Sequence, residues 1–403
     1  MKKWLLAITL CIFCSLHAEA QIINNWRGPL RDGVYPESGL LKSWPQNGPE
    51  MLWAFENLGS GYTSPSFANG KIYITGAEDS IGYVYVLNEA GALQSKIKYG
   101  PEFIVNYPGS RTSTLVDGNL LYKTSGHGVL YCIDLTTQKV KWTKDYFNEY
   151  DGKNIRFGFT EGLLIKDNML FCQPGGVKYN MVALDKVTGK EIWVSGGKGD
   201  LSAYCSPLLI THNNREMLVN MMAENIIALD PKTGTLLWSH PYKNNRSIHP
   251  NAPVYKNGML YCFSGYGKGG IMLRINEAGT GVTEVWADTK LDNQMGGTVV
   301  VNGRIYGSGQ NNPKWTILDW NTGQVLGEAT DPGKGNVIFA DGLLYIYSEK
   351  GELALAEPTP TGLKVISKTN ITKGTEQHWA HPVIRNGVLY VRHGSALMAF
   401  RIK

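Results

Sequence analysis

Histidine and arginine residues that could take part in chemistry lie where strand-like segments begin. The segment "HWAH" at 378–381 holds two histidines, and His249 stands just before the apolar run of another segment. An unperturbed imidazole titrates near neutral pH, so His249 and His381 are candidate proton-transfer groups. Arg111 is a third candidate, because its guanidinium can pair with a carboxylate or a quinone oxygen. These three residues fit β-elimination on a uronic-acid polymer, where a cation neutralises the carboxylate and a base removes the adjacent proton.

Aromatic and amide side chains at the corresponding positions of other segments extend this set. Tyr62, Tyr204 and Trp379 could stack on a sugar or on a planar ring. We predict a ligand-binding site made of Tyr62, Arg111, Phe159, Tyr204, His249, Gln294, Asn336, His378, Trp379 and His381. The alternative is that these residues only satisfy backbone groups at strand ends. Carboxylates are scarce there, with Glu161 and Glu376 the nearest, and a hard divalent ion needs several oxygen ligands, so no metal site is predicted.

The elements that must position these residues are marked by two repeated phrases. The first is a turn dipeptide followed by alternating apolar residues: "NGKIY" at 69, "DGNLLY" at 117, "DNMLF" at 167, "NGMLY" at 257, "NGRIY" at 302, "DGLLY" at 341 and "NGVLY" at 386, with a degenerate copy, "NNREML", at 213. Asn-Gly or Asp-Gly between alternating hydrophobic segments is a strong hairpin signal. Eight copies at steps of about forty to fifty residues are typical of propeller blades.

The second phrase is "ALDPKTGTLLW" at 228–238, repeated as "ALDKVTGKEIW" at 183–193 and more loosely as "CIDLTTQKVKW" at 132–142. Its period-two pattern on both sides of a turn predicts the third and fourth strands of a blade. The tryptophans that end such segments are expected to fill the space between neighbouring blades, and they are Trp142, Trp193, Trp238 and Trp286. Blade geometry therefore explains this phrase without a cofactor.

The two ends of the chain are predicted to complete one blade together. The last repeat, "HPVIRNGVLYVRHGSALMAFRIK", ends after its third strand, and "PEMLWAFEN" at 49–57 has the pattern of the missing outer strand. Closing the ring in this way removes its open edges. We predict an all-β fold, an eight-bladed β-propeller of four-stranded antiparallel blades, as a single domain over 49–403. An irregular strap over 21–48 precedes it.

Residues 1–20 have the features of a signal peptide. Two lysines precede an apolar run at 4–16, and "AEA" at 18–20 offers a small-x-small cleavage site. The run is too short to span a membrane. Neither Cys11 nor Cys14 follows the small residue that a lipid-attachment site needs. The mature protein is therefore expected to begin near Gln21 and to be exported, either periplasmic or secreted.

Composition and charge narrow the classes of partner. The chain has 403 residues, of which 43% are hydrophobic and 18% charged, as in folded globular proteins. Its formal charge of +5 comes without a run of Lys or Arg, so neither nucleic acid nor a membrane surface is expected as a partner. No later segment is long and apolar enough for a transmembrane span. Four cysteines sit singly in apolar segments and are expected to be buried free thiols: Cys132, Cys172, Cys205 and Cys262.

The repeats, together with "WRGPLRDGVYPESGLLKSWP" before them, resemble the PQQ-like β-propeller repeat family. That family includes quinoprotein dehydrogenases and the outer-membrane assembly scaffold BamB. Resemblance to the dehydrogenases implies pyrroloquinoline quinone on the propeller axis, a calcium ion held by carboxylate and amide ligands, and in some members a disulfide between adjacent cysteines. This sequence has no Cys-Cys pair and few carboxylates at the mouth, so quinone with calcium is not favoured. Resemblance to BamB implies a scaffold without catalysis.

Three functions remain open on the sequence alone. The first and favoured one is a binding or scaffold propeller that recognises a glycan, a small molecule or a protein surface at the channel mouth. The second is a quinoprotein oxidoreductase that depends on pyrroloquinoline quinone. The third is a polysaccharide lyase that uses Arg111, His249 and His381. A propeller supports many activities, so the choice must come from the site.

Overall fold

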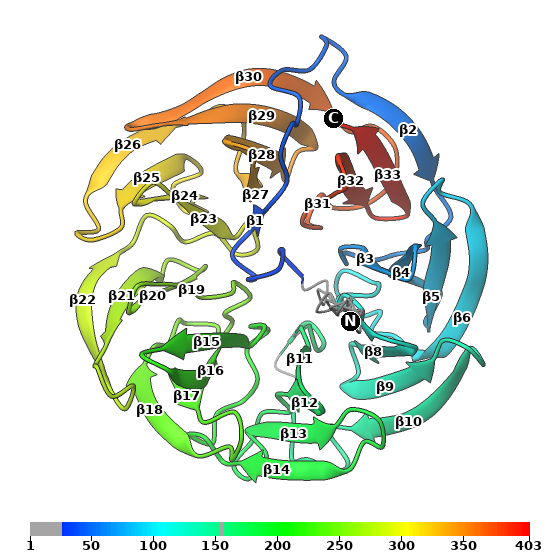
Figure 1. Ribbon diagram of the computed structural model, residues 1–403, viewed down its shortest axis with the longest axis vertical. Helices are drawn as coiled ribbons and strands as arrows, with labels where there is room; N and C mark the ends of the chain where they lie inside the picture. The colour runs from blue at the N-terminus through cyan, green and yellow to red at the C-terminus, as the bar shows by residue number, and fades with distance from the viewer. Residues whose placement is uncertain (1–25, 154–155, 161) are drawn as a thin grey trace, which may run out of the picture.

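The protein forms a ring of eight β-sheet blades around a central axis (Figure 1). The computed structural model describes residues 26–153, 156–160 and 162–403. Every blade has four antiparallel strands, arranged from the axis outward. The eight-bladed β-propeller predicted from the repeats is thereby confirmed. Within the described ranges there is no α-helix, and hence no helix suited to cross a membrane.

The blades begin at the axis and, apart from the closing strand of the eighth, contain consecutive strands of the chain. The first is β3 (Ser66–Ala68), β4 (Lys71–Glu78), β5 (Ile81–Asn88) and β6 (Leu93–Pro101), and the second is β7 (Leu115–Asp117), β8 (Leu120–Thr124), β9 (Val129–Asp134) and β10 (Lys139–Asp145). The third is β11 (Leu164–Lys166), β12 (Met169–Cys172), β13 (Met181–Asp185) and β14 (Glu191–Ser195), and the fourth is β15 (Leu208–His212), β16 (Arg215–Met221), β17 (Asn225–Leu229) and β18 (Leu236–Pro241). The fifth is β19 (Val254–Lys256), β20 (Met259–Ser264), β21 (Gly269–Ile275) and β22 (Val282–Asp288), and the sixth is β23 (Thr298–Val301), β24 (Arg304–Ser308), β25 (Trp315–Asp319) and β26 (Val325–Ala329). The seventh is β27 (Gly335–Ala340), β28 (Leu343–Ser348), β29 (Glu352–Thr359) and β30 (Gly362–Asn370), and the eighth is β31 (Val383–Arg385), β32 (Val388–His393) and β33 (Ala396–Arg401) with β2 (Glu50–Phe55).

The first two strands of each blade are joined by the turn that the first sequence phrase predicts. In the fifth blade Asn257 and Gly258 have φ angles of 50° and 78°, and in the sixth Asn302 and Gly303 have 48° and 72°. Two consecutive residues with positive φ make the type I′ turn, whose twist matches that of the flanking strands. The same pair of positive φ angles occurs in six of the eight blades, so local sequence fixes the register of these inner hairpins.

The second phrase fastens the second blade to the third and the third to the fourth. Trp193, at the outer strand of the third blade, donates its indole N–H to the carbonyl of Pro231 in the fourth blade at 3.0 Å. Its ring packs against Gly234, which has a φ of +71° and leaves no room for a Cβ atom. Asp230 shapes the same turn by accepting the backbone N–H of Lys232 at 2.8 Å. The Asp-to-Gly turn thus serves as the seat for the neighbouring tryptophan.

The hydrophobic core lies between blades as well as within them. Tyr73 and Val84 of the first blade pack in one buried cluster with Leu121 and Ile133 of the second. Similar clusters join other neighbouring blades around the ring. Cys132, Cys205 and Cys262 are buried free thiols in such clusters, as the sequence predicts, and Cys172 is buried there too.

The ring closes by pairing the two ends of the propeller. Strand β2 runs antiparallel to β33, with Glu50 opposite Arg401 and Phe55 opposite Leu397 (Figure 1). Trp53 of β2 donates its indole N–H to the carbonyl of Glu89 at 2.9 Å, so the same interblade contact spans the closing junction. The predicted closure by the segment 49–57 is confirmed.

The strap that precedes the propeller enters the mouth of the channel. Strand β1 (Val34–Tyr35) pairs in parallel with β27 and adds a fifth, inner strand to the seventh blade. The buried Arg27 side chain donates to the carbonyl of Thr298 at 2.7 Å. Arg31, also buried, donates to the carbonyls of Leu163 and Pro207. Two strap arginines therefore contact blades on different sides of the ring.

Candidate functional site

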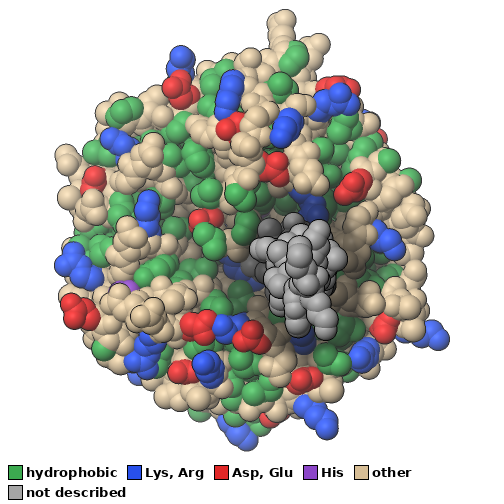
Figure 2. Space-filling model, viewed as in Figure 1, with side chains coloured by type: hydrophobic (Ala, Val, Ile, Leu, Met, Phe, Trp, Pro, Cys, Tyr) green, Lys and Arg blue, Asp and Glu red, His purple; other side chains and the backbone are tan. Residues whose placement is uncertain are grey.

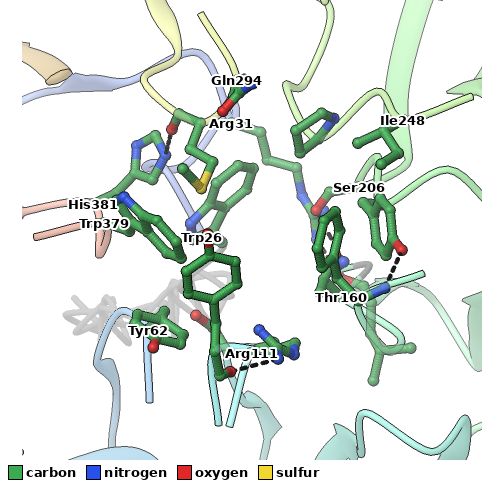
Figure 3. Close-up of a pocket in the computed structure, with 18 of the residues that line it drawn as sticks. Trp26, Arg31, Tyr62, Arg111, Thr160, Ser206, Ile248, Gln294, Trp379 and His381 are labelled. Atoms are coloured by element: carbon green, nitrogen blue, oxygen red, sulfur yellow. Dashed lines mark hydrogen bonds between the residues drawn. The ribbon is translucent and has the colours of Figure 1, made fainter. Parts of the chain in front are cut away.

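A cavity of about 370 Å³ opens at the channel mouth, within the size range of small-ligand sites (Figure 3). Its walls come from the strap and from loops that lead into the inner strands of several blades. Six of the predicted ligand residues line it: Tyr62, Arg111, Tyr204, Gln294, Trp379 and His381. The remaining described lining residues are Trp26, Arg31, Tyr107, Ser113, Thr114, Leu115, Phe157, Thr160, Gly162, Leu163, Ser206, Ile248, Pro250, Tyr266 and Met295.

One wall of the cavity is aromatic. The ring centroids of Tyr62 and Trp379 are 5.1 Å apart, and the planes meet at 43°. Tyr107 meets Trp379 at 4.8 Å and 64°, and its other neighbour is Phe157 at 6.2 Å. Tilted and edge-to-face rings at these distances are favourable and hold one another in place. The wall is therefore preorganised from four loops, which lead into the first, second, third and eighth blades.

The Tyr62 ring is also fixed through its hydroxyl group. That hydroxyl contacts Glu376 Oε2 at 3.0 Å and Gln377 Oε1 at 2.9 Å, and Ser60 donates to Glu376 Oε1 at 2.8 Å. Burial, and next the charge of Glu376, raise the pKa of the Tyr62 hydroxyl above its ordinary value. Tyr62 is thus a neutral ring whose polar end is occupied, and the face of the ring is what it offers to a ligand.

Arg111 brings a positive charge to the cavity. Its Nη2 donates to the carbonyls of Asn106 and Tyr107, at 2.7 and 2.5 Å. Its Nε is buried without a hydrogen-bond partner, and in the described part of the chain its guanidinium forms no ion pair. Burial lowers the pKa of this guanidinium from its ordinary value, but an arginine remains charged near neutral pH. Arg111 therefore has hydrogen-bonding capacity left for a ligand.

The side of the cavity opposite the aromatic wall carries hydroxyl groups (Figure 3). Tyr204 Oη accepts the backbone N–H groups of Arg156 and Phe157 at 3.1 and 2.9 Å. Ser206 Oγ accepts the N–H of Gly162 at 2.9 Å. Because these oxygens act as acceptors, their own O–H protons remain free to point at a ligand. Burial raises the pKa of the Tyr204 hydroxyl, so it stays a proton donor for hydrogen bonds.

His381 lies in the cavity wall, but its ring is fully engaged. Its Nε2 is 2.7 Å from the carbonyl of Met295, which can only accept, so Nε2 carries the proton. Its Nδ1 then accepts from Arg27 Nη1 at 2.9 Å. Burial, followed by the charge of Arg27, holds the pKa of His381 well below its usual range. The imidazole is therefore held neutral, with neither nitrogen free to move a substrate proton.

His249 lies outside the residues that line the cavity. It is fully buried, and its ring nitrogens contact Ser264 Oγ at 2.9 Å and the carbonyl of Ala223 at 3.3 Å. Burial lowers the pKa of His249 to about 4. This histidine links the loops of neighbouring blades and has no path to a substrate in the cavity.

Three other predicted ligand residues also lie outside the cavity lining. Phe159 is buried in the core between the second and third blades. Asn336 is buried and donates to the carbonyl of Trp379 at 3.1 Å, so it positions the aromatic wall from behind. His378 stacks on His393 at 3.7 Å and contacts the Tyr347 hydroxyl, and burial lowers the pKa of His378 to about 4.

The residues that sequence reasoning missed come mainly from the strap and from long loops. Trp26 and Arg31 line the cavity, although the strap was expected only to precede the propeller. Tyr107 and Phe157 precede the predicted positions by a few residues, in loops whose path no repeat specifies. Tyr266 belongs to a hairpin turn and has a φ of 62°. An aromatic residue beside Gly or Pro in a loop is the only sequence signal these last three share.

Comparison with known proteins places this architecture in a family. The model of a family described as outer membrane protein assembly factor BamB matches residues 80–326. The chain belongs to this family. The match runs from the third strand of the first blade into the last strand of the sixth, and it agrees with the resemblance that the repeats indicate.

Solved structures share the fold of this BamB-family propeller at low sequence identity. BamB from Moraxella catarrhalis is 13% identical, with a TM-score of 0.64 over 88% of this chain and all of that one. A quinohemoprotein alcohol dehydrogenase from Pseudomonas putida is 13% identical, with a TM-score of 0.63 over 94% of this chain and 80% of that one. Identities this low show a common fold and leave the function to the site.

One curated relative matches part of the chain. A tetrathionate hydrolase from Acidithiobacillus ferrooxidans is 23% identical over 225 residues, which are 54% of this chain and 44% of the hydrolase. The chain therefore spans less than half the length of this relative.

The cavity does not fit the calcium-quinone centre that the dehydrogenase resemblance implies. A hard cation such as calcium needs six to eight oxygen ligands. None of the described residues that line the cavity is an Asp or a Glu, and in this part of the chain no three His, Cys, Asp or Glu side chains gather to hold a metal. Glu376 is engaged with Ser60 and Tyr62, and Glu161 lies outside the described residues. The lining is aromatic and cationic instead.

Proposed function

We propose that this BamB-family propeller is an exported binding protein whose channel-mouth cavity takes a ring-bearing ligand. The observation that carries the proposal is the juxtaposition of a preorganised aromatic wall with an arginine whose guanidinium has unused donors. Convergence of apolar rings and a few polar groups in one concave site is the usual composition of a ligand pocket. Export rests on residues 1–20, which lie outside the described part of the chain.

Two enzymatic alternatives have weaker support from the same cavity. A quinoprotein oxidoreductase would need ligands for calcium, and the described lining offers no carboxylate. A lyase would need a base near the substrate. Both ring nitrogens of His381 are hydrogen-bonded, to Met295 and to Arg27, and His249 lies outside the cavity. Tyr204 is no substitute, because burial raises the pKa of its hydroxyl. Binding requires none of these groups to change protonation.

A protein partner is the role suggested by the family description, outer membrane protein assembly factor. Such a partner would contact a broad face of the ring, whereas the present cavity is concave and small. The cavity therefore supports a small ligand or a glycan more directly than it supports a scaffold role.

The proposal can be tested by titrating the mature chain with a panel of neutral and acidic oligosaccharides, followed by calorimetry. Replacing Trp379 by Ala should weaken the binding of any ligand found by about tenfold or more, because a central aromatic anchor is lost. Trp53→Phe is the matched control, since Trp53 lies at the outer strand of the eighth blade, where it contacts Glu89. Equal affinity in wild type and Trp379→Ala, with both folded, would contradict a ligand site at the mouth.

A further inference from the structure

We propose that the ligand is an acidic glycan, with a sugar carboxylate paired to Arg111 and the sugar ring stacked on the Trp379 wall. This inference rests on the proposed function and names its ligand class. Four features of the cavity carry it: its charge, the tilt of its aromatic rings, its hydroxyl-bearing side and its open rim.

The positive charge of the cavity lining favours a negatively charged ligand. Arg31 and Arg111 both line it, and no acidic side chain does so among the described residues. Arg31 donates to the carbonyls of Leu163 and Pro207, in other parts of the ring, whereas Arg111 donates only to carbonyls of its own loop and has a buried Nε without a partner. Glu102 and Glu376 act on the charge of Arg111, but neither forms an ion pair with it, and a bound carboxylate would satisfy its Nε with a charge-assisted hydrogen bond. The ligand's negative charge is thus expected at Arg111.

This attraction is local to the cavity. On the face drawn in Figure 2, Lys and Arg side chains are interspersed with Asp and Glu around the ring. A face of mixed charge does not attract polyanions over long distances. Selection for an acidic ligand must therefore come from contact with Arg111.

The tilt of the aromatic rings favours a puckered sugar over a flat polycyclic compound. Around Trp379 the ring planes meet at 43° with Tyr62 and at 64° with Tyr107. A planar ligand gains most when it is enclosed by parallel faces, and no such pair is formed by these rings. A sugar ring needs only one aromatic face for its C–H groups and leaves its hydroxyl groups pointing sideways.

The opposite side of the cavity matches those hydroxyl groups. Tyr204 and Ser206 each accept a backbone N–H and keep an O–H to donate. Thr160 also lines the cavity and forms no hydrogen bond with described residues. Three hydroxyls with spare donors suit the several oxygens of a sugar, while an aromatic carboxylate would leave them without partners.

The rim of the cavity allows a chain of sugars to continue outward. Tyr107 is 44% exposed, so the aromatic wall extends from the cavity to the surface. Arg156 lies over the Phe157 ring at 5.3 Å, and both Arg156 and Arg246 act electrostatically on the Tyr266 hydroxyl. Further cations beyond Arg111 would meet the next carboxylates of a polymer of acidic sugars.

The test compares two ligands that differ only in charge. An oligosaccharide of galacturonic acid, and the same oligosaccharide with its carboxyl groups reduced to alcohols, are titrated into the mature chain by calorimetry. At low salt the acidic form should bind about 10- to 100-fold more tightly, the range expected for one charge-assisted contact. Arg111→Met should abolish this preference, so that the two forms bind within about twofold of each other.

The variants separate loss of the carboxylate contact from loss of loop order. Because Arg111 also holds the carbonyls of Asn106 and Tyr107, its removal could disturb the aromatic wall, but that would weaken both ligands alike. Arg274→Met removes the same charge from an exposed residue of β21 that does not line the cavity, and it should keep the preference for the acidic form.

Each other result overturns the inference in a distinguishable way. Equal binding of both forms, with both weakened by Trp379→Ala, would leave the ligand site standing and refute the carboxylate contact. Tight, Arg111-dependent binding of a naphthalene carboxylate without binding of either sugar would refute the glycan. Failure of all three probes to bind would refute the acidic glycan and remove the support for a ligand site as well.

Discussion

His249 should make the stability of this protein depend on pH, and it should do so without a role in binding. Burial lowers its pKa to about 4 in the folded state, whereas an unfolded histidine has a pKa of about 6.5. Between these values the unfolded chain binds more protons, so stability rises with pH. The contribution is complete above about pH 6.5 and is lost as the pH falls. From about pH 7.5 to about pH 5 the loss is about 2 kcal/mol, and at about pH 4 it reaches about 3 kcal/mol.

The measurement is urea unfolding at about pH 7.5 and about pH 5, where most carboxylates are still ionised. In His249→Gln a polar amide remains beside Ala223 and Ser264, but it does not titrate, so the loss of stability on acidification should shrink by about 2 kcal/mol. Ser264→Ala is the control, because it removes the hydrogen bond at 2.9 Å and keeps the imidazole. It should lower stability at both pH values. An unchanged pH dependence in His249→Gln would refute the reasoning.

Two further predictions concern the interblade contacts and the strap. Gly234→Ala should lose about 1 to 3 kcal/mol more stability than Gly70→Ala, because a Cβ at Gly234 would lie 2.5 Å from the Trp193 ring, while Gly70, with a similar positive φ, faces open space. Equal losses in urea unfolding would show that the tryptophan is not tightly seated. Arg27→Met should cost about 3 kcal/mol or more, because it leaves His381 Nδ1 and two carbonyls buried without a donor. Wild-type stability in this variant would mean that the strap is not held by its arginine.

The fold could be predicted because its information is local and repeated. A turn such as Asn257-Gly258 fixes the register of one hairpin. The Asp-to-Gly turn around Asp230 forms the surface that Trp193 packs against. Short local segments therefore determine much of the structure of a blade. Closure by the segment 49–57 followed from counting strands. The fifth strand, β1, could not be predicted, because a two-residue strand has no pattern and its pairing with β27 depends on where the strap lies.

The site was only partly predictable, for a physical reason. Repeat register locates residues that enter inner strands, and it found Tyr62, Arg111 and Trp379 in this way. It says nothing about loops that fold back over the mouth, so it missed Tyr107, and it did not bring the strap residue Trp26 into the wall. Residue type also could not predict that both ring nitrogens of His381 would be hydrogen-bonded, since the partners, Arg27 and Met295, lie far away in the sequence.

Spare hydrogen-bonding capacity, more than residue type, is the criterion by which we propose which residues of this channel bind a ligand. Arg27 and Arg111 both lie near the mouth, and both are mostly buried. Arg27 donates to Thr298, Val337 and His381, which join the strap to the sixth, seventh and eighth blades. Its donors are therefore committed to holding the ring together. Arg111 commits one nitrogen to its own loop and leaves Nε without a partner. A folded protein keeps a buried donor unsatisfied at a cost of about 1 to 3 kcal/mol, and a ligand that satisfies it recovers that free energy on binding. Arg111 has such an unsatisfied donor at the mouth and Arg27 does not, which is the physical reason to expect the ligand at Arg111.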